Sequence, residues 1–250
     1  MLHQIRPSIA RPETLGSSIR NLLAVPFAAL ALGFASSASA SFLVQDDFNR
    51  PNSQTLGVMS DGVHSWSESG GEGGANARIN SNLLRLYDAG NHGVAVAGFT
   101  VADAIISVDL AELTRNRAGV TYRAPSEGDA YNLFSATNTY QVVIRQNWAG
   151  TEDIELRYAN TQLATYDFGP GVDFETGTLR IEFEGDRHQV FYNDTSVIDM
   201  IHAGNMSAGY IGIAAATSQS RWDNFTVIPE PASAALVGLG ALLALRRRRN

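Results

Sequence analysis

Apolar and polar side chains alternate with a period of two in several stretches of the chain between residues 75 and 228. The clearest alternating runs are residues 84–87, 106–110, 140–145 and 179–184. Successive side chains of a β-strand point to opposite faces, so this period predicts strands with one buried side and one solvent-facing side. Residues 41–228 contain no stretch of ten or more residues with a helical period, and we therefore expect an all-β body.

Turn-forming residues separate the alternating runs. Gly, Pro, Asn and Asp gather at residues 88–91, 125–129, 147–150, 169–171, 185–186 and 193–194. These residue types adopt turn conformations that other residues avoid. Short strands with one apolar face must bury that face against another sheet, and this favours an antiparallel sandwich or a barrel.

The run from Thr178 to Ile198 resembles the late hairpins of concanavalin A-like (laminin G-like) jelly rolls, because a strand, a Gly-Asp turn, a second strand and an Asn-Asp turn follow in quick order. Residues 208–213 (AGYIGI) and 222–227 (WDNFTV) resemble the closing strands of such domains, and residues 46–50 (DDFNR) echo the last strand. The resemblance implies an antiparallel two-sheet jelly-roll sandwich over residues 41–228. It also implies that the first and last strands lie side by side, and that the domain is of a lectin or glucanase type.

The end of the chain has three parts. They are the block Pro229, Glu230 and Pro231, an apolar run from Ala232 to Leu245, and the basic cluster Arg246, Arg247, Arg248 and Arg249. Each proline pushes the residue before it toward an extended conformation, so Glu230 is presented on an extended backbone. The apolar run has 14 residues, fewer than the roughly 20 that span a bilayer as a helix. Under the positive-inside rule the arginines stay cytoplasmic and the body lies across the membrane.

This three-part tail resembles the PEP-CTERM sorting signal, which an exosortase processes in exopolysaccharide-producing Gram-negative bacteria. The resemblance implies that residues 229–250 are a sorting tail whose short apolar helix holds the chain transiently in the inner membrane. It further implies a destination in the cell envelope or extracellular matrix. An ordinary short C-terminal anchor is the alternative.

The N-terminus has the pattern of a secretory signal peptide. Basic residues Arg6, Arg11 and Arg20 precede an apolar run of 13 residues from Leu22 to Phe34. A small-residue stretch then ends in Ala38-Ser39-Ala40, which fits the A-x-A pattern of signal peptidase. We therefore predict that residues 1–40 are removed by cleavage after Ala40. A permanent N-terminal anchor is the alternative, but the apolar run is short for one.

The basic residues are concentrated at the two ends of the chain. Without residues 1–40 and 229–250, the body has 11 arginines against 23 acidic residues, a formal charge near −12. An acidic body argues against a nucleic-acid partner, which would require phosphate contacts. The chain contains no cysteine, so its stability depends on its core and no thiol chemistry is available.

Tryptophans are the first candidates for glycan contact, because aromatic rings stack on the C–H faces of sugars. Trp148 follows Gln146 and Asn147 in a predicted turn, where an aromatic ring is hard to bury. Trp66 is a second candidate contact in a loop-rich region, whereas Trp222 flanks the closing strand and is expected in the core.

Asp47 and Asp223 are candidate ligands for a structural Ca²⁺, because they occupy matching positions in the first and last strands. Ca²⁺ takes six to eight oxygen ligands, including carboxylates and backbone carbonyls. The alternative is that both are polar residues at strand ends. The histidines of the body lie far apart in the sequence and predict no zinc site.

Two acidic pairs test for glycoside hydrolysis. Glucanases of this fold have a motif that resembles E-x-D-x-x-E or E-x-D-x-E, but here Glu152 and Asp153 are adjacent and only Asp153 and Glu155 share a strand face. We interpret this stretch as a solvated strand edge. Glu182 and Glu184 alternate with apolar residues and either line a groove or face solvent as ordinary surface charges.

The sequence thus predicts an exported, exosortase-sorted protein whose β-sandwich binds carbohydrate, such as exopolysaccharide, without catalysis. A structural surface module with no glycan ligand is the second hypothesis, and a divergent glycan-active hydrolase is the third. No cofactor other than Ca²⁺ is expected.

Overall fold

The computed structural model describes most of the body, within one compact unit of residues Ala40–Asn250. The described residues are 43–69, 77–87, 91–114, 116–135, 137–148, 151–169, 174, 176–216 and 219–229. They form fifteen strands and one short helix. All strand pairs are antiparallel, which confirms the predicted all-β class.

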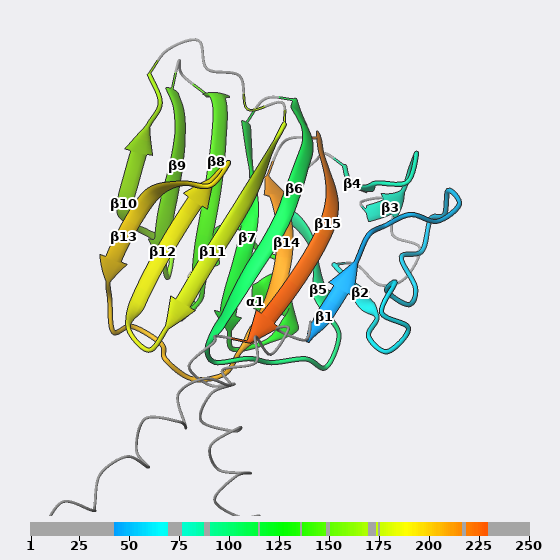
Figure 1. Ribbon diagram of the computed structural model, residues 1–250, viewed down its shortest axis with the longest axis horizontal. Coiled ribbons are helices and arrows are strands. Elements are labelled where there is room, and N and C mark those ends of the chain that lie inside the picture. Colours follow the sequence, from blue (N-terminus) through cyan, green and yellow to red (C-terminus); the bar gives the residue numbers. More distant parts are fainter. Residues whose placement is uncertain are drawn as a thin grey trace, which may run out of the picture. The chain divides into compact units, whose positions relative to one another are not determined.

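The strands form two sheets that pack face to face (Figure 1). In spatial order, the first sheet contains β13 (Thr195–Ile201), β12 (Arg187–Tyr192), β11 (Gly177–Glu184), β6 (Ala104–Thr114), β15 (Gln219–Pro229), β4 (Leu84–Leu86) and β3 (Ala77–Ile79), with β1 (Val44–Asp46) also paired to β15. The second sheet contains β10 (Thr161–Asp167), β9 (Thr151–Tyr158), β8 (Tyr140–Trp148), β7 (Asn116–Ala124), β14 (Tyr210–Ala216), β5 (Asn91–Val96) and β2 (Trp66–Glu68). From β5 onward the chain changes sheet between β5 and β6, between β6 and β7, between β10 and β11, between β13 and β14, and between β14 and β15, as the predicted jelly-roll sandwich requires.

The first and last strands of the body lie side by side. Val44 of β1 pairs with Val227 of β15, and Asp46 pairs with Phe225. The pairing confirms the expectation from the echo between residues 46–50 and 222–227. It also holds the first strand of the sandwich, β1, directly beside the last strand, β15.

The hairpins β11–β12–β13 follow the predicted turns. Asn193 and Asp194, which join β12 to β13, have φ values of 48° and 60°. A two-residue turn with both φ values positive matches the right-handed twist of the strands, and Asn and Asp tolerate that conformation better than most residues. The turn therefore sets the register in which Tyr192 pairs with Thr195.

The apolar sides of both sheets form one core between the layers. Its fully or almost fully buried members include Leu84, Val108, Leu110, Val120, Ile144, Leu156, Ile181, Ile213 and Trp222. The burial of Trp222 confirms its expected place in the core. Alternation along each strand leaves the opposite side chains on the outer faces of the sheets.

The segment between β7 and β8 packs over β5, β7 and β14 on the outer face of the second sheet. It contains α1 (Glu127–Ala130), which begins after Ser126, whose side chain accepts a hydrogen bond from the amide of Asp129. At Gly93 of β5, a Cβ atom would lie 2.6 Å from the carbonyl oxygen of Tyr131, so the small residue permits this close approach. Under this cover Thr121, Gln141 and Ala214 are fully buried.

Several predicted features lie outside the described residues. These are the signal peptide with Ala38 and Ala40, and the sorting tail from Glu230 onward with its apolar helix. Pro229 is described as the last residue of β15, opposite Ala104, so the last strand runs one residue past the predicted domain boundary at residue 228. Where helix is described, it is too short and too polar to cross a membrane.

Candidate functional site

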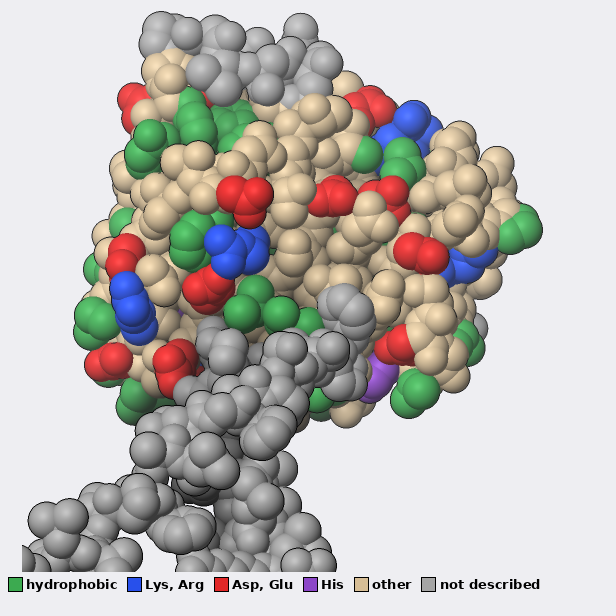
Figure 2. Space-filling model, in the orientation of Figure 1, with side chains coloured by type: hydrophobic (Ala, Val, Ile, Leu, Met, Phe, Trp, Pro, Cys, Tyr) green, Lys and Arg blue, Asp and Glu red, His purple; other side chains and the backbone are tan. Residues whose placement is uncertain are grey.

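The outer face of the first sheet is open to solvent across β6, β11 and β12. Side chains of Ser107, Arg180, Glu182 and Gln189 are partly exposed on this face. Figure 2 views the molecule from this side and shows acidic and basic side chains interspersed over it. On the second sheet, in contrast, the β7–β8 segment packs over β5, β7 and β14.

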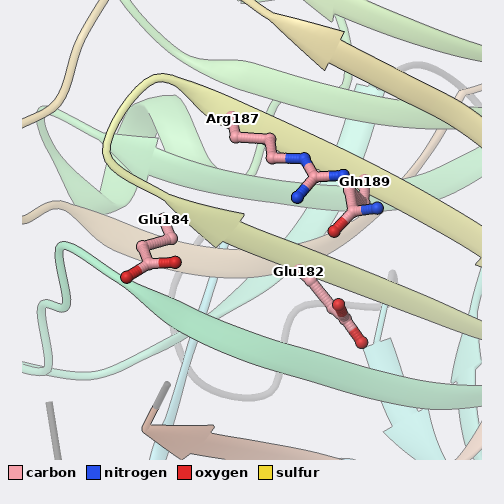
Figure 3. Close-up of a pocket in the computed structure, with 4 residues that line it drawn as sticks. All are labelled: Glu182, Glu184, Arg187 and Gln189. Carbon is pink, nitrogen blue, oxygen red and sulfur yellow. The ribbon is translucent and has the colours of Figure 1, made fainter. Parts of the chain in front are cut away.

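Four polar residues line a shallow pocket on this face (Figure 3). Glu182 and Glu184 come from β11, and Arg187 and Gln189 come from β12. They form two cross-strand pairs, since Glu182 is opposite Gln189 and Glu184 is opposite Arg187. The pocket has a volume of about 60 Å³. Strand alternation thus places at one spot two carboxylates, a guanidinium and an amide.

Ion pairs fix most of the charge around this pocket. Arg187 donates two hydrogen bonds to Asp199 of β13. The Nε–Oδ1 distance is 3.0 Å and the Nη2–Oδ2 distance is 2.7 Å. This hydrogen bonding lowers the pKa of Asp199 and raises that of Arg187. Glu182 pairs with Arg180. The side chain of Glu184 forms no hydrogen bond or ion pair with a described residue, although its charge interacts with that of Arg187, its cross-strand partner.

The stretch from Glu152 to Glu155 is not a solvated strand edge, so that prediction is wrong. Asp153 and Glu155 do share a face, but β9 is an inner strand and Glu155 is only 1% exposed. Arg145 binds Asp153, and Arg157 Nη1 lies 2.8 Å from Glu155 Oε2. These carboxylates are held in a buried ion-pair network that a polysaccharide cannot reach.

Trp66 is buried and has no exposed ring face for a sugar, which corrects its interpretation as a candidate glycan contact. Its side chain is 4% exposed and stacks on Phe48, with ring centroids 5.7 Å apart. Trp66 Nε1 donates a hydrogen bond to Asp46 Oδ2 over 2.6 Å. The indole therefore closes one end of the core.

Asp46 is the hub of this buried cluster. Arg50 Nη1 and Nη2 lie 2.6 and 2.9 Å from the two Asp46 oxygens, and the amide of Phe48 donates to Oδ1. Sequence reasoning missed this structural role of Asp46. Its sequence signal is the spacing of four between Asp46 and Arg50, together with an aromatic residue between them.

Trp148 is the last residue of β8, and its backbone pairs with Thr151 of β9. The strand thus extends into the predicted turn at residues 147–150 and ends at Trp148. The placement of its indole lies outside what the structure describes. Its role as a glycan contact stays a prediction.

Asp47 and Asp223 lie close enough for their charges to interact. Burial, followed by the negative charges of Asp109, Asp47 and Asp46, raises the pKa of Asp223. Asp109 is already engaged, since it accepts hydrogen bonds from Thr178 and Asn224. Among the residues that the structure describes, no group of three or more acidic or histidine side chains is arranged to hold a metal ion. The predicted Ca²⁺ site therefore has no coordination set in that part of the chain.

Two histidines distant in sequence meet inside the sandwich. His188 Nδ1 lies 2.9 Å from the hydroxyl of Tyr122, and its Nε2 lies 3.2 Å from the carbonyl oxygen of His202. Tyr140 joins the group through its hydroxyl, 2.9 Å from His202 Nδ1. Sequence spacing carries no trace of this cluster, because three strands and a loop bring its members together.

Stability should fall as the pH drops through the range in which His188 titrates in the unfolded chain. Burial lowers the pKa of His188 from 6.5 to about 4. Between these values the unfolded state binds the proton and the folded state does not, so acid favours unfolding. The loss should be on the order of 3 kcal/mol between neutral pH and about pH 4. Urea unfolding across this range measures it.

His188→Gln is the matched variant, because glutamine can still accept a hydrogen bond from Tyr122. The variant should show a weaker dependence of unfolding free energy on pH between about pH 4 and 6.5. The same pH slope in both proteins would contradict the assignment to His188.

Comparison with known proteins bears on the fold. No protein-family model and no curated protein matches this chain. A protein of unknown function with a galectin-like fold from Bacillus subtilis is similar with a TM-score of 0.55 and 10% identity, covering 76% of this chain and 96% of that one. SCLam, a non-specific endo-β-1,3(4)-glucanase of family GH16, is similar with a TM-score of 0.53 and 12% identity, covering 77% of this chain and 92% of that one. The exoplasmic/lumenal domain of VIP36 in its Ca²⁺/Man-bound form is similar with a TM-score of 0.52 and 10% identity, covering 68% of this chain and 84% of that one. By these likenesses the fold is a concanavalin A- or galectin-like jelly roll.

Proposed function

We propose that the β-sandwich binds carbohydrate without catalysis. The observation that carries this proposal is the open polar pocket lined by Glu182, Glu184, Arg187 and Gln189. Sugar hydroxyls both donate and accept hydrogen bonds, and carboxylate, amide and guanidinium groups meet both needs. Similar folds in a glucanase and in mannose-bound VIP36 are consistent with a sugar ligand.

Binding rather than hydrolysis agrees better with the arrangement of carboxylates. Glycoside hydrolysis uses two carboxyl groups that flank the bond to be broken. Of the two pocket glutamates, Glu182 is engaged by Arg180. The acidic pair on β9, Asp153 and Glu155, is buried against arginines. A divergent hydrolase therefore ranks below a binding module.

We infer further that the protein is exported, sorted by an exosortase and retained at the cell envelope or in an exopolysaccharide matrix. The support is the signal-peptide pattern of residues 1–40 and the three-part tail of residues 229–250. Signal peptidase, exosortase and, transiently, the inner membrane are then the partners in processing. Intact-mass measurement of the secreted protein, with Glu230→Ala for comparison, tests both cleavage events.

A glycan array with the purified full chain tests carbohydrate binding. Binding should weaken roughly tenfold in Gln189→Ala, because each lost hydrogen bond to a sugar costs about 1 kcal/mol and some packing is lost with it. Trp148→Ala tests the predicted aromatic contact. No binding to any glycan would favour a structural surface module. Release of reducing sugar that disappears in Glu184→Gln would instead favour a hydrolase.

A further inference from the structure

We propose that the pocket on the first sheet takes a cationic glycan, namely an amino sugar with a free ammonium group. This inference rests on the proposed function and specifies its ligand class. It follows from which polar groups of the pocket are already engaged and which are left for a ligand.

The donors of the pocket are largely occupied. Arg187 directs Nε and Nη2 at Asp199, and Gln189 Nε2 lies 3.2 Å from the same carboxylate. A ligand carboxylate would therefore have to compete with Asp199 for the guanidinium. The pocket offers little to an acidic sugar such as a uronic acid.

The acceptors, in contrast, remain available. The Glu184 side chain is exposed and forms no hydrogen bond or ion pair with a described residue, and its charge interacts with that of Arg187. Gln189 has its Oε1 atom left to accept. Figure 3 shows Glu182 and Glu184 on the same strand, with the Arg187 and Gln189 side chains beside them on the next. The net charge that the pocket presents to a ligand is the carboxylate of Glu184.

A second observation on the same sheet points to a positive ligand. Asp109 of β6 and Asp223 of β15 are direct cross-strand partners, and like charges in this relation destabilise a sheet. Asp47 adds a third carboxylate nearby and contributes to the raised pKa of Asp223. No arginine pairs with Asp109 or Asp223 among the ion pairs of the described residues. Asp47, Asp109 and Asp223 thus form an acidic cluster beside β6 and β15, on the sheet that also carries the ion-paired Arg180 and Arg221.

An ammonium group matches these features. It donates three hydrogen bonds and forms charge-assisted bonds with carboxylates, which are stronger than bonds between neutral groups. A chain of amino sugars repeats this charge, so an ammonium group beyond the one at Glu184 can meet the carboxylates of Asp109 and Asp223. A neutral sugar would leave the charge of Glu184 unpaired.

The test compares two oligosaccharides of equal length with the full chain, by titration calorimetry at low salt. One is an oligomer of glucosamine, and the other is the same oligomer with every amine acetylated. The glucosamine oligomer should bind at least roughly tenfold more tightly, because acetylation removes the charge and one donor bond to Glu184. The difference in affinity between the two oligomers should become smaller as salt is added.

Two variants test whether the preference for the glucosamine oligomer depends on Glu184. Glu184→Gln keeps the shape of the side chain and should remove most of the preference for the glucosamine oligomer. Glu127→Gln is the matched control, because Glu127 lies on α1 over the other sheet and glutamine can still accept from the amide of Gly98. The control variant should keep the full preference.

The possible failures are distinguishable. Equal or tighter binding of the acetylated oligomer would overturn the charge assignment and leave carbohydrate binding intact. No binding of either oligomer or of any arrayed glycan would overturn both. Binding of an oligolysine of equal charge as tightly as glucosamine would show general attraction of cations and overturn the sugar site.

Discussion

Replacing Asp46 with alanine should lower the free energy of unfolding by about 3–5 kcal/mol, because a buried ion pair loses one partner. Asp46 is fully buried and receives hydrogen bonds from Arg50, Trp66 and the amide of Phe48. Its removal leaves Arg50 Nη1 and the Trp66 N–H without their acceptor, while Arg50 Nη2 keeps the carbonyl oxygen of Leu56. Domains are stable by about 5–15 kcal/mol in total, so a large fraction of folding stability is at stake.

Urea unfolding measures this loss, and Asp47→Ala is the neighbouring control. Asp47 is partly exposed and accepts a hydrogen bond only from the nearby amide of Asn49. Its replacement should change stability by about 0.5 kcal/mol or less. Asp46→Asn should fall between the two, because the amide keeps one acceptor but loses the charge. Similar unfolding midpoints for the Asp46 and Asp47 variants would refute the assigned role of Asp46.

The second large effect is expected at Arg123, whose guanidinium joins three loops at one end of the sandwich. Arg123 is fully buried and donates to the carbonyl oxygens of Ala102, Gly185 and Asn205. It also pairs with Asp103 over 3.0 Å. Arg123→Ala leaves these acceptors unpaired and opens a cavity, so we expect a loss of about 3–5 kcal/mol.

Arg123→Lys should not restore the lost stability, because one ammonium group cannot reach the separate acceptors that the planar guanidinium of Arg123 reaches. Arg180→Ala is the control, because that arginine is partly exposed and forms one ion pair, with Glu182. It should cost about 1 kcal/mol or less. Amide hydrogen exchange in residues 101–103 and 203–207 should quicken in Arg123→Ala alone. Unchanged exchange there would argue that other contacts hold these loops.

The buried arginine shows what sequence reasoning lacked. Arg123 stands in the run Thr121-Tyr122-Arg123, where alternation alone assigns it to a solvent-facing position on β7. Its backbone φ of 49° and the register shift between β7 and β14 turn the end of the strand away from the regular pleat. Which loops then surround the guanidinium depends on contacts across 62 to 82 residues of chain.

The acidic residues of β9 make the same point. Adjacent Glu152 and Asp153 were correctly expected on opposite faces, because strand geometry is local. Their burial was not predicted, because it depends on β10 pairing beyond β9 and on the β7–β8 segment lying over the sheet, with Phe134 near Arg157. An alternating pattern gives the face of a residue but not what covers that face.

The sequence by itself determined the all-β class, the hairpins around Gly185 and Asn193, and the pairing of first and last strands. The all-β class and the hairpins follow from side-chain period and turn chemistry, which act over a few residues, whereas the strand pairing was expected from the resemblance to concanavalin A-like jelly rolls. The last strand was also recognisable from the similarity of residues 222–227 to residues 46–50. Only the tertiary structure decided that the β7–β8 segment packs over part of the second sheet, that Trp66 is buried on Asp46, and that the Glu184 side chain stays exposed opposite Arg187. Those outcomes depend on which distant segments pack together, and no local pattern of residues encodes them.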